Sequence, residues 1–232
     1  MSMTIDEMSA RYVDPEMKAA GEKVPSFLVS ADGHVDEPAD MFNELPPSIL
    51  DRMTRPKVQP DTRPKGGSDP AVRITDMDID GVAAEVLYPT FTLGLFASEP
   101  DVQEAAFRVY NDWIADFCNT SPKRLFAIPC ISVYDIDGAI KEMHRCNDMG
   151  LKGALVWQVL DPKLPLTSPH YEKLWAAAAE MDYPLNFHIL TGFNYFREKR
   201  AGMEKVRGSV NIKTSEVVTT VFDLIWSGVF ER

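Results

Sequence analysis

The stretch Phe27-Leu28-Val29-Ser30-Ala31-Asp32-Gly33-His34-Val35-Asp36-Glu37-Pro38 decides how the rest of this sequence is interpreted. Residues 27–31 form a short apolar run that predicts a buried strand, and polar residues follow it abruptly. The turn after this strand contains neither a GxGxxG motif nor a Walker loop, one of which a doubly wound nucleotide-binding fold usually carries. Side chains capable of chemistry occupy the turn instead, and this favours a (β/α) barrel.

Strand-like and helix-like segments then alternate along the chain. Further strands are predicted over 82–88, 125–131, 153–157 and 184–189. Helices are predicted around 74–80, from Pro100 onward, from Asp135 to near Gly150, from Ser168 onward and over 214–229. Such alternation implies a parallel sheet with crossover helices, either doubly wound or closed into a barrel.

Two of these helices carry specific expectations. Ser98 and Asp101 are expected to form a capping box at the helix that Pro100 opens. Apolar residues at helical spacing share one face, so this helix is expected to bury Val102, Ala106, Val109, Trp113 and Phe117. By the same argument the last helix is expected to bury Val218, Val221, Phe222 and Ile225.

The chain divides into an arm and a barrel-like domain. Residues 1–25 are polar and are expected to form an N-terminal arm, and residues 26–232 a partial barrel. Seven of the 17 prolines lie within 38–70, so no helix runs through this segment and a long loop is expected there. Long irregular loops in compact proteins are usually functional or disordered.

Composition excludes several classes of protein. The chain is 45% apolar and 25% charged, as in an ordinary soluble globular protein. Its net charge of −11 repels phosphate backbones, so nucleic-acid binding is not expected. Neither a membrane span nor a secretory signal is expected. The three cysteines lack CxxC spacing and are expected to be small hydrophobes in a reduced, cytoplasmic protein.

Three residues form a candidate metal site. Asp32 and His34 are two residues apart at the end of the first strand, so both side chains point to one face. In a barrel this is the end where active sites lie, and a carboxylate with an imidazole suits a divalent ion such as zinc. The alternative is an aspartate that caps the turn and a histidine bonded to the backbone. His188 ends another apolar strand, where a polar side chain needs a partner.

The other two histidines are expected to have ordinary roles. His144 lies within a predicted helix beside its apolar face, and His170 lies in the first turn of another. We interpret both as surface or packing residues.

Several motifs of the sequence, taken in order, resemble those of a known family. Ser30–Pro38 resembles the opening motif of the amidohydrolase-related family, in the metal-dependent branch with aminocarboxymuconate-semialdehyde and γ-resorcylate decarboxylases. Further matching segments follow in order: Met77–Val82 with Leu87–Thr90, Tyr110–Trp113, Pro122–Leu125 with Ile128–Pro129, Gly150–Gly153, and Tyr171–Trp175 with Pro184–His188. The resemblance covers roughly residues 27–232.

This resemblance implies a distorted (β/α)8 barrel of the TIM-barrel type with one catalytic divalent metal. Asp32 and His34 match the first-strand ligands, and His188 matches the fifth-strand ligand. The ion is expected to be Zn²⁺, with Mn²⁺ or Mg²⁺ as alternatives. The substrate is expected to be a small carboxylate, and relatives are often homodimers. Relatives either decarboxylate without oxidation or hydrolyse amide or lactone bonds.

The same resemblance implies that part of the site is missing. Relatives add a histidine on the sixth strand and an aspartate on the eighth, and both are expected to lie beyond Arg232. About five βα units are therefore expected here. The alternatives are a fragment of a longer enzyme and a truncated, catalytically incomplete barrel that binds metal weakly or not at all.

Further residues are candidates for substrate binding. Glu37 follows the metal motif and is expected to orient a ligand or the substrate. Arg55, with Arg52 and Arg63 of the proline-rich loop, is a candidate fork for a substrate carboxylate. Trp157 ends the fourth strand and is a candidate wall of an apolar pocket. The alternatives are solvated charges and, for Trp157, a place in the core.

Overall fold

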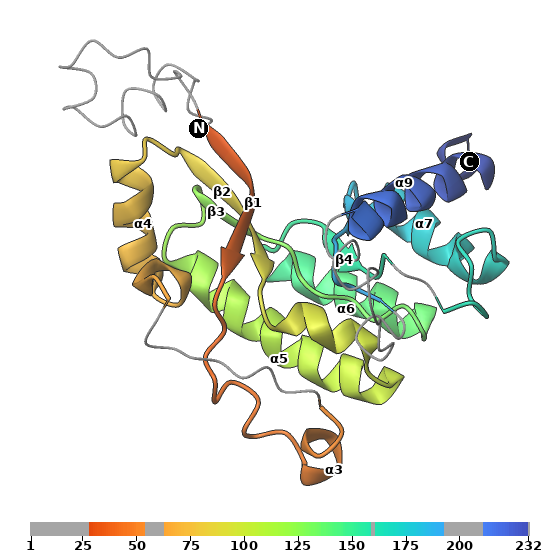
Figure 1. Cartoon of the computed structure of the whole chain (residues 1–232), viewed down its shortest axis with the longest axis horizontal. Helices are drawn as coiled ribbons and strands as arrows, with labels where there is room; N and C mark the ends of the chain where they lie inside the picture. Colours follow the sequence, from red (N-terminus) through yellow and green to blue (C-terminus); the bar gives the residue numbers. More distant parts are fainter. Residues whose placement is uncertain (1–27, 54–62, 159–160, 193–210, 232) are drawn as a thin grey trace.

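The computed structural model describes residues 28–53, 63–158, 161–192 and 211–231 (Figure 1). The predicted arm at 1–25 lies outside the described residues. Five strands follow one another along the chain: β1 (Val29–Val35), β2 (Ala84–Pro89), β3 (Leu125–Ala127), β4 (Ala154–Val156) and β5 (Leu185–Phe187). The predicted alternation of strands and helices is therefore confirmed over these residues.

The described strands are parallel and lie in sequence order. β1, β2 and β3 form one sheet, and β4 pairs with β5 in a second. A bridge between Cys130 and Leu155 joins the chain after β3 to β4. A doubly wound sheet reverses its strand order at one point, whereas a barrel continues in a single direction. The observed order is the consecutive one, and closure into eight strands stays a prediction.

Helices connect these strands and cover them. The longer helices are α4 (Pro70–Ile79), α5 (Pro100–Asn119), α6 (Ile136–Asp148), α7 (Glu172–Glu180) and α9 (Asn211–Trp226). The short ones are α3 (Pro47–Leu50), η2 (Lys65–Gly67), η3 (Thr92–Ala97), η4 (Pro169–Tyr171) and η5 (Val229–Glu231). Figure 1 shows α5 and α6 side by side along the strands. Within the described residues, no helix is both long and apolar enough to cross a membrane.

β1 differs from the predicted strand. It runs through the polar motif to Val35. The predicted burial of residues 27–31 is wrong for the described part of this stretch: Val29 and Leu28 just before it are 43% and 39% exposed, and Ala31 is also exposed. Its pairing with β2 shifts register between Ser30 and Gly33. Such a bulge places an extra residue in one strand and re-aims the side chains beside it. Asp32 lies within this irregular stretch.

The predicted capping box at α5 is wrong. The residue before the helix is Glu99, and no side chain of the described residues caps the helix N-terminus. Ser98 instead closes η3, because its N–H donates to the carbonyl of Leu95. Pro100 at the start of α5 has no N–H, so the first turn needs one partner fewer.

The buried face of α5 is also rotated from the predicted stripe. Val102, Ala106 and Phe117 are buried as expected, but Val109 and Trp113 are only half-buried. Their neighbours Tyr110, Asn111 and Ile114 are fully buried instead. In α6 the buried apolar residues include Ile136, Met143 and Cys146.

The predicted buried face of α9 is wrong. The four residues expected inside are 47–52% exposed, and Trp226 is 78% exposed. Thr220 and Leu224 face the protein instead, and the Thr220 hydroxyl donates to the carbonyl of Gln158 at 3.3 Å. The helix therefore packs through a small, partly polar face and leaves its larger apolar face exposed among the described residues.

The cysteines behave as predicted. All three are free and buried, and burial raises their pKa values, that of Cys118 to about 12. Thiols with such pKa values stay protonated and unreactive near neutral pH.

Asn111 holds the link between the two sheets in place. Its side chain is fully buried on α5, accepts from the N–H of Cys130 at 2.8 Å and donates to the carbonyl of Cys130 at 3.0 Å. The same amide donates to Glu142 of α6 at 2.9 Å. One amide thus satisfies both main-chain groups of the bridging residue.

Replacing Asn111 by Ala should lower the free energy of unfolding by about 2–3 kcal/mol, because it leaves buried main-chain groups unpaired. Urea unfolding followed by circular dichroism measures this. Asn119→Ala, at the exposed end of the same helix, is the matched control. Equal stability losses in the two variants would contradict the role given to Asn111.

Candidate metal centre

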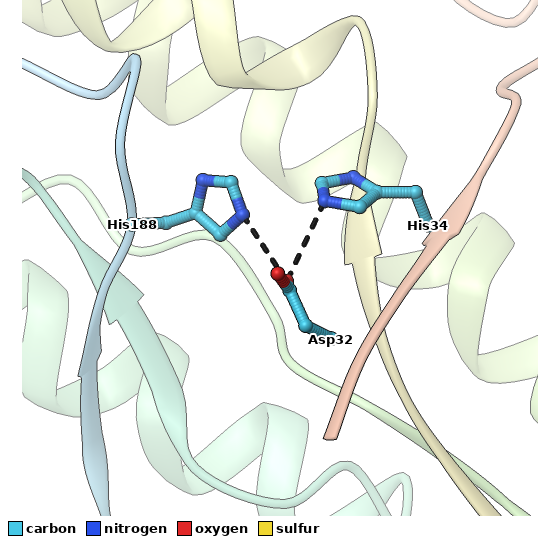
Figure 2. Close-up of side chains that lie close together, drawn as sticks. All are labelled: Asp32, His34 and His188. Atoms are coloured by element: carbon cyan, nitrogen blue, oxygen red, sulfur yellow. Dashed lines mark ion pairs between the residues drawn. The ribbon is translucent and has the colours of Figure 1, made fainter. Parts of the chain in front are cut away.

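The side chains of Asp32, His34 and His188 converge at the carboxyl ends of the strands (Figure 2). One ligand atom from each lies within 4.8 Å of the others. Asp32 and His34 come from β1, and His188 directly follows β5. Consecutive parallel strands bring these ends to one edge, and the structure therefore joins the three residues that the sequence singled out.

The Asp32 carboxylate lies between the two imidazoles. Its Oδ1 is 3.6 Å from Nε2 of His34 and 3.4 Å from Nε2 of His188. The two rings meet edge to face, with centroids 5.0 Å apart. The Asp32 side chain is 73% exposed, whereas those of His34 and His188 are 35% and 11% exposed. The group is therefore open to solvent on the carboxylate side.

Main-chain carbonyls set the orientation of both imidazoles. Nδ1 of His34 donates to the carbonyl of Pro89 at 2.8 Å, and Nδ1 of His188 donates to that of Ile189 at 2.6 Å. A carbonyl only accepts, so in the neutral ring the proton resides on Nδ1 and Nε2 keeps its lone pair. Metal-binding histidines are held in this way in proteins. His34 is therefore bonded to the backbone, as the alternative to a metal site supposed. This bond uses only Nδ1, so Nε2 remains available to bind a metal ion.

The turn that carries His188 is strained. The Thr191 N–H and hydroxyl both donate to the carbonyl of His188, at 3.3 and 2.7 Å. Leu190 inside this turn has φ of +73°, a conformation that favours glycine. Strain of this kind persists where the surrounding structure enforces it, often at functional sites.

Tyr88 and Asn186 are further site residues that the sequence did not reveal. The Tyr88 ring lies 5.2 Å from that of His188, and its hydroxyl donates to Oδ1 of Asn186 at 3.0 Å. Burial and then the charge of Asp32 raise the pKa of Tyr88, so its hydroxyl remains a donor. Asn186 lies in β5, two residues before His188, and this spacing is the sequence signal that both side chains face the site.

Glu37 is buried, but the main chain occupies its carboxylate. It is 3% exposed and accepts hydrogen bonds from the N–H groups of Thr90, Phe91 and Thr92. Direct contact with substrate, which the sequence predicted, requires these bonds to break. Substrate binding by Glu37 stays a prediction.

The other candidates have partners of their own. Arg52 pairs with Asp101, and Arg63 pairs with Asp36, so these guanidinium groups are not free for a substrate. Arg55 lies outside the described residues. Trp157 is 1% exposed, and its indole N–H donates to the Tyr171 hydroxyl at 3.2 Å. Trp157 therefore packs in the core, and its contact with substrate stays a prediction.

His144 and His170 lie apart from this group, as predicted. His144 is exposed on α6, and His170 bonds through Nε2 to the carbonyl of Val133 at 2.8 Å. Neither belongs to the converging set of Asp32, His34 and His188.

A family model described as amidohydrolase matches residues 31–232, and the chain belongs to this family. Its curated relatives include gamma-resorcylate decarboxylase from Rhizobium radiobacter, 31% identical over 173 residues, which are 71% of this chain and 46% of that protein. The enzyme of the same name from Rhodococcus jostii is 27% identical over 131 residues, 53% of this chain and 40% of that protein. The chain thus spans about half the length of the curated relatives it matches.

Solved structures show the same fold. A 2,6-dihydroxybenzoate decarboxylase from Rhizobium matches with a TM-score of 0.60 at 20% identity, over 88% of this chain and 62% of that one. A manganese-bound 5-carboxyvanillate decarboxylase from Novosphingobium aromaticivorans matches with a TM-score of 0.64 at 19% identity, over 86% and 61%. An amidohydrolase from Mycobacterium avium subsp. paratuberculosis gives 0.68 at 18% identity, over 90% and 70%.

The Tyr88–Asn186 bond joins the two sheets beside the candidate metal centre. Tyr88→Phe should therefore lower the free energy of unfolding by about 1 kcal/mol. In an Asn186→Ala background the same substitution should have a much smaller effect, because the partner is already gone. A double-mutant cycle from denaturant unfolding measures this coupling, and strictly additive losses would disprove it.

Proposed function

We propose that Asp32, His34 and His188 bind one divalent metal ion and that the protein is a non-oxidative decarboxylase of a small carboxylated ring compound. The observation that carries the proposal is the convergence of both Nε2 atoms on one carboxylate oxygen, while each Nδ1 is bonded to a main-chain carbonyl. Two imidazoles and a carboxylate form a mixed N/O donor set, which suits Zn²⁺ and Mn²⁺. Manganese in the 5-carboxyvanillate and dihydroxybenzoic acid decarboxylases makes Mn²⁺ an ion to test beside Zn²⁺.

The reaction breaks one carbon–carbon bond. The bond between the ring carbon and the carboxyl carbon breaks, carbon dioxide leaves, and the electron pair on the ring carbon takes up a proton. When bound, a divalent ion supplies positive charge beside an anionic oxygen of the substrate. Tyr88 offers a neutral hydroxyl at the same edge, fixed by Asn186 and suited to orienting a polar ring substituent.

Hydrolysis of an amide or lactone is the second candidate function. It is supported by the description of the chain's family as amidohydrolase. The decarboxylases among the relatives support carbon dioxide loss over hydrolysis. A homodimer and a cytoplasmic location stay predictions.

Replacing His34 or His188 by Ala should weaken binding of Mn²⁺ and Zn²⁺ by more than about 100-fold, because changes outside the ligand shell already cost 10–100-fold. Calorimetric titration of the metal-free chain measures this. His144→Ala, which removes an exposed imidazole from α6, is the matched control and should bind as the unchanged protein does. Unchanged affinity in both site variants would remove the proposed centre.

The activity is tested on the full chain loaded with Mn²⁺. Release of carbon dioxide from 2,6-dihydroxybenzoate and from 5-carboxyvanillate, followed by headspace gas analysis, should exceed that of the His188→Ala variant by at least about 100-fold. Cleavage of amide or lactone substrates without carbon dioxide release would replace this proposal with the hydrolase.

A further inference from the structure

All the hydrogen bonds of the buried Glu37 carboxylate within the described residues come from the main chain. Its oxygens accept from the N–H groups of Thr90 at 3.1 Å, Phe91 at 3.0 Å and Thr92 at 2.8 Å. None of the ion pairs among the described residues includes Glu37. Three consecutive N–H groups therefore compensate the desolvated carboxylate, and in return it fixes the path of residues 90–92.

These residues directly follow the carbonyl that holds His34. Pro89 is the last residue of β2, and its carbonyl accepts the proton of His34 Nδ1. β3 pairs with β2 only as far as Leu87, and proline has no N–H to donate. Among the described residues, no ladder hydrogen bond continues beyond Leu87 on that side of β2. Glu37 supplies three bonds just beyond this point.

The direction of the Pro89 carbonyl decides which His34 nitrogen is free. While the carbonyl accepts from Nδ1, the neutral ring keeps its proton there and presents a bare Nε2 to Asp32. Rotation of this peptide group would remove that preference, because a neutral imidazole can carry its proton on either nitrogen. The ring would then also be free to turn.

We propose that Glu37 is a positioning residue for the metal centre: by binding residues 90–92 it holds the Pro89 carbonyl that keeps Nε2 of His34 available as a ligand. The inference rests on the proposed metal site. Glu37 is not itself a proposed ligand, and it acts through the main chain of residues 90–92.

The isosteric variant Glu37→Gln tests the requirement for two accepting oxygens. A glutamine has one accepting oxygen, and its NH2 group would face main-chain N–H donors. We expect the Nδ1-protonated tautomer of His34, dominant in the unchanged protein, to become a mixture in the variant. Nitrogen-15 NMR of the imidazoles in the metal-free chain at pH 8 measures this, with His170 as the internal reference. Mn²⁺ affinity should fall by 10–100-fold.

Two controls separate positioning from stability. Arg124→Met removes a buried guanidinium that binds the Val82 and Ala83 carbonyls at the amino ends of the strands. It should destabilise the chain yet leave the His34 tautomer and the Mn²⁺ affinity unchanged. Glu37→Asp keeps the carboxylate on a shorter side chain, and we expect it to recover part of the tautomer preference and of the affinity.

The proposal is overturned if His34 keeps its tautomer in both Glu37 variants, or if Arg124→Met changes it equally. Because the NMR measurement needs no metal, it decides the role of Glu37 even if the unchanged chain binds no divalent ion. That last result would overturn the proposed function alone.

Discussion

The candidate metal centre depends on one short main-chain link between two sheets. Asp32 and His34 belong to the sheet of β1, whereas His188 follows β5 in the other. The sheets meet where Leu155 donates to the Pro129 carbonyl at 2.8 Å and Ile131 donates to the Leu155 carbonyl at 2.9 Å. Because of these bonds, the strands of the second sheet continue the parallel order of the first. Asp32 and His34 therefore lie at the same edge as His188.

Electrostatics pose a second constraint on any chemistry at this edge. The proposed carboxylated substrate would approach a chain of net charge −11, and Asp32 adds an exposed negative charge at the site itself. Of the arginines in the proline-rich loop, Arg52 and Arg63 are already paired with aspartates. Positive charge for the substrate is thus best supplied by the proposed divalent ion, and the same negative field favours the arrival of that ion.

Local patterns predicted the alternation of strands and helices along the chain and the three candidate ligands, because strand-like apolar runs and the polar residues at their ends are visible in the sequence. The buried face of α9 could not be predicted from local patterns. Apolar spacing shows which residues share a face of the helix, but not whether another part of the protein packs against that face. The sequence places Tyr88 at the end of a predicted strand, and no local pattern relates it to Asn186, which lies far along the chain. The contacts of Glu37 were hidden for another reason: its partners are N–H groups, which every residue except proline carries. The predicted histidine and aspartate of later strands stay predictions.

The anchoring of both imidazoles by the main chain bears on how this protein tolerates change. Pro89 and Ile189 contribute carbonyl groups, which survive any substitution at those positions. The residues next to the two histidines can therefore be substituted without loss of the hydrogen bonds that orient the imidazoles, provided that the backbone keeps its conformation. Sequence freedom is then smallest where a side chain or a strained residue determines that path, as Glu37 does after β2 and Leu190 after His188.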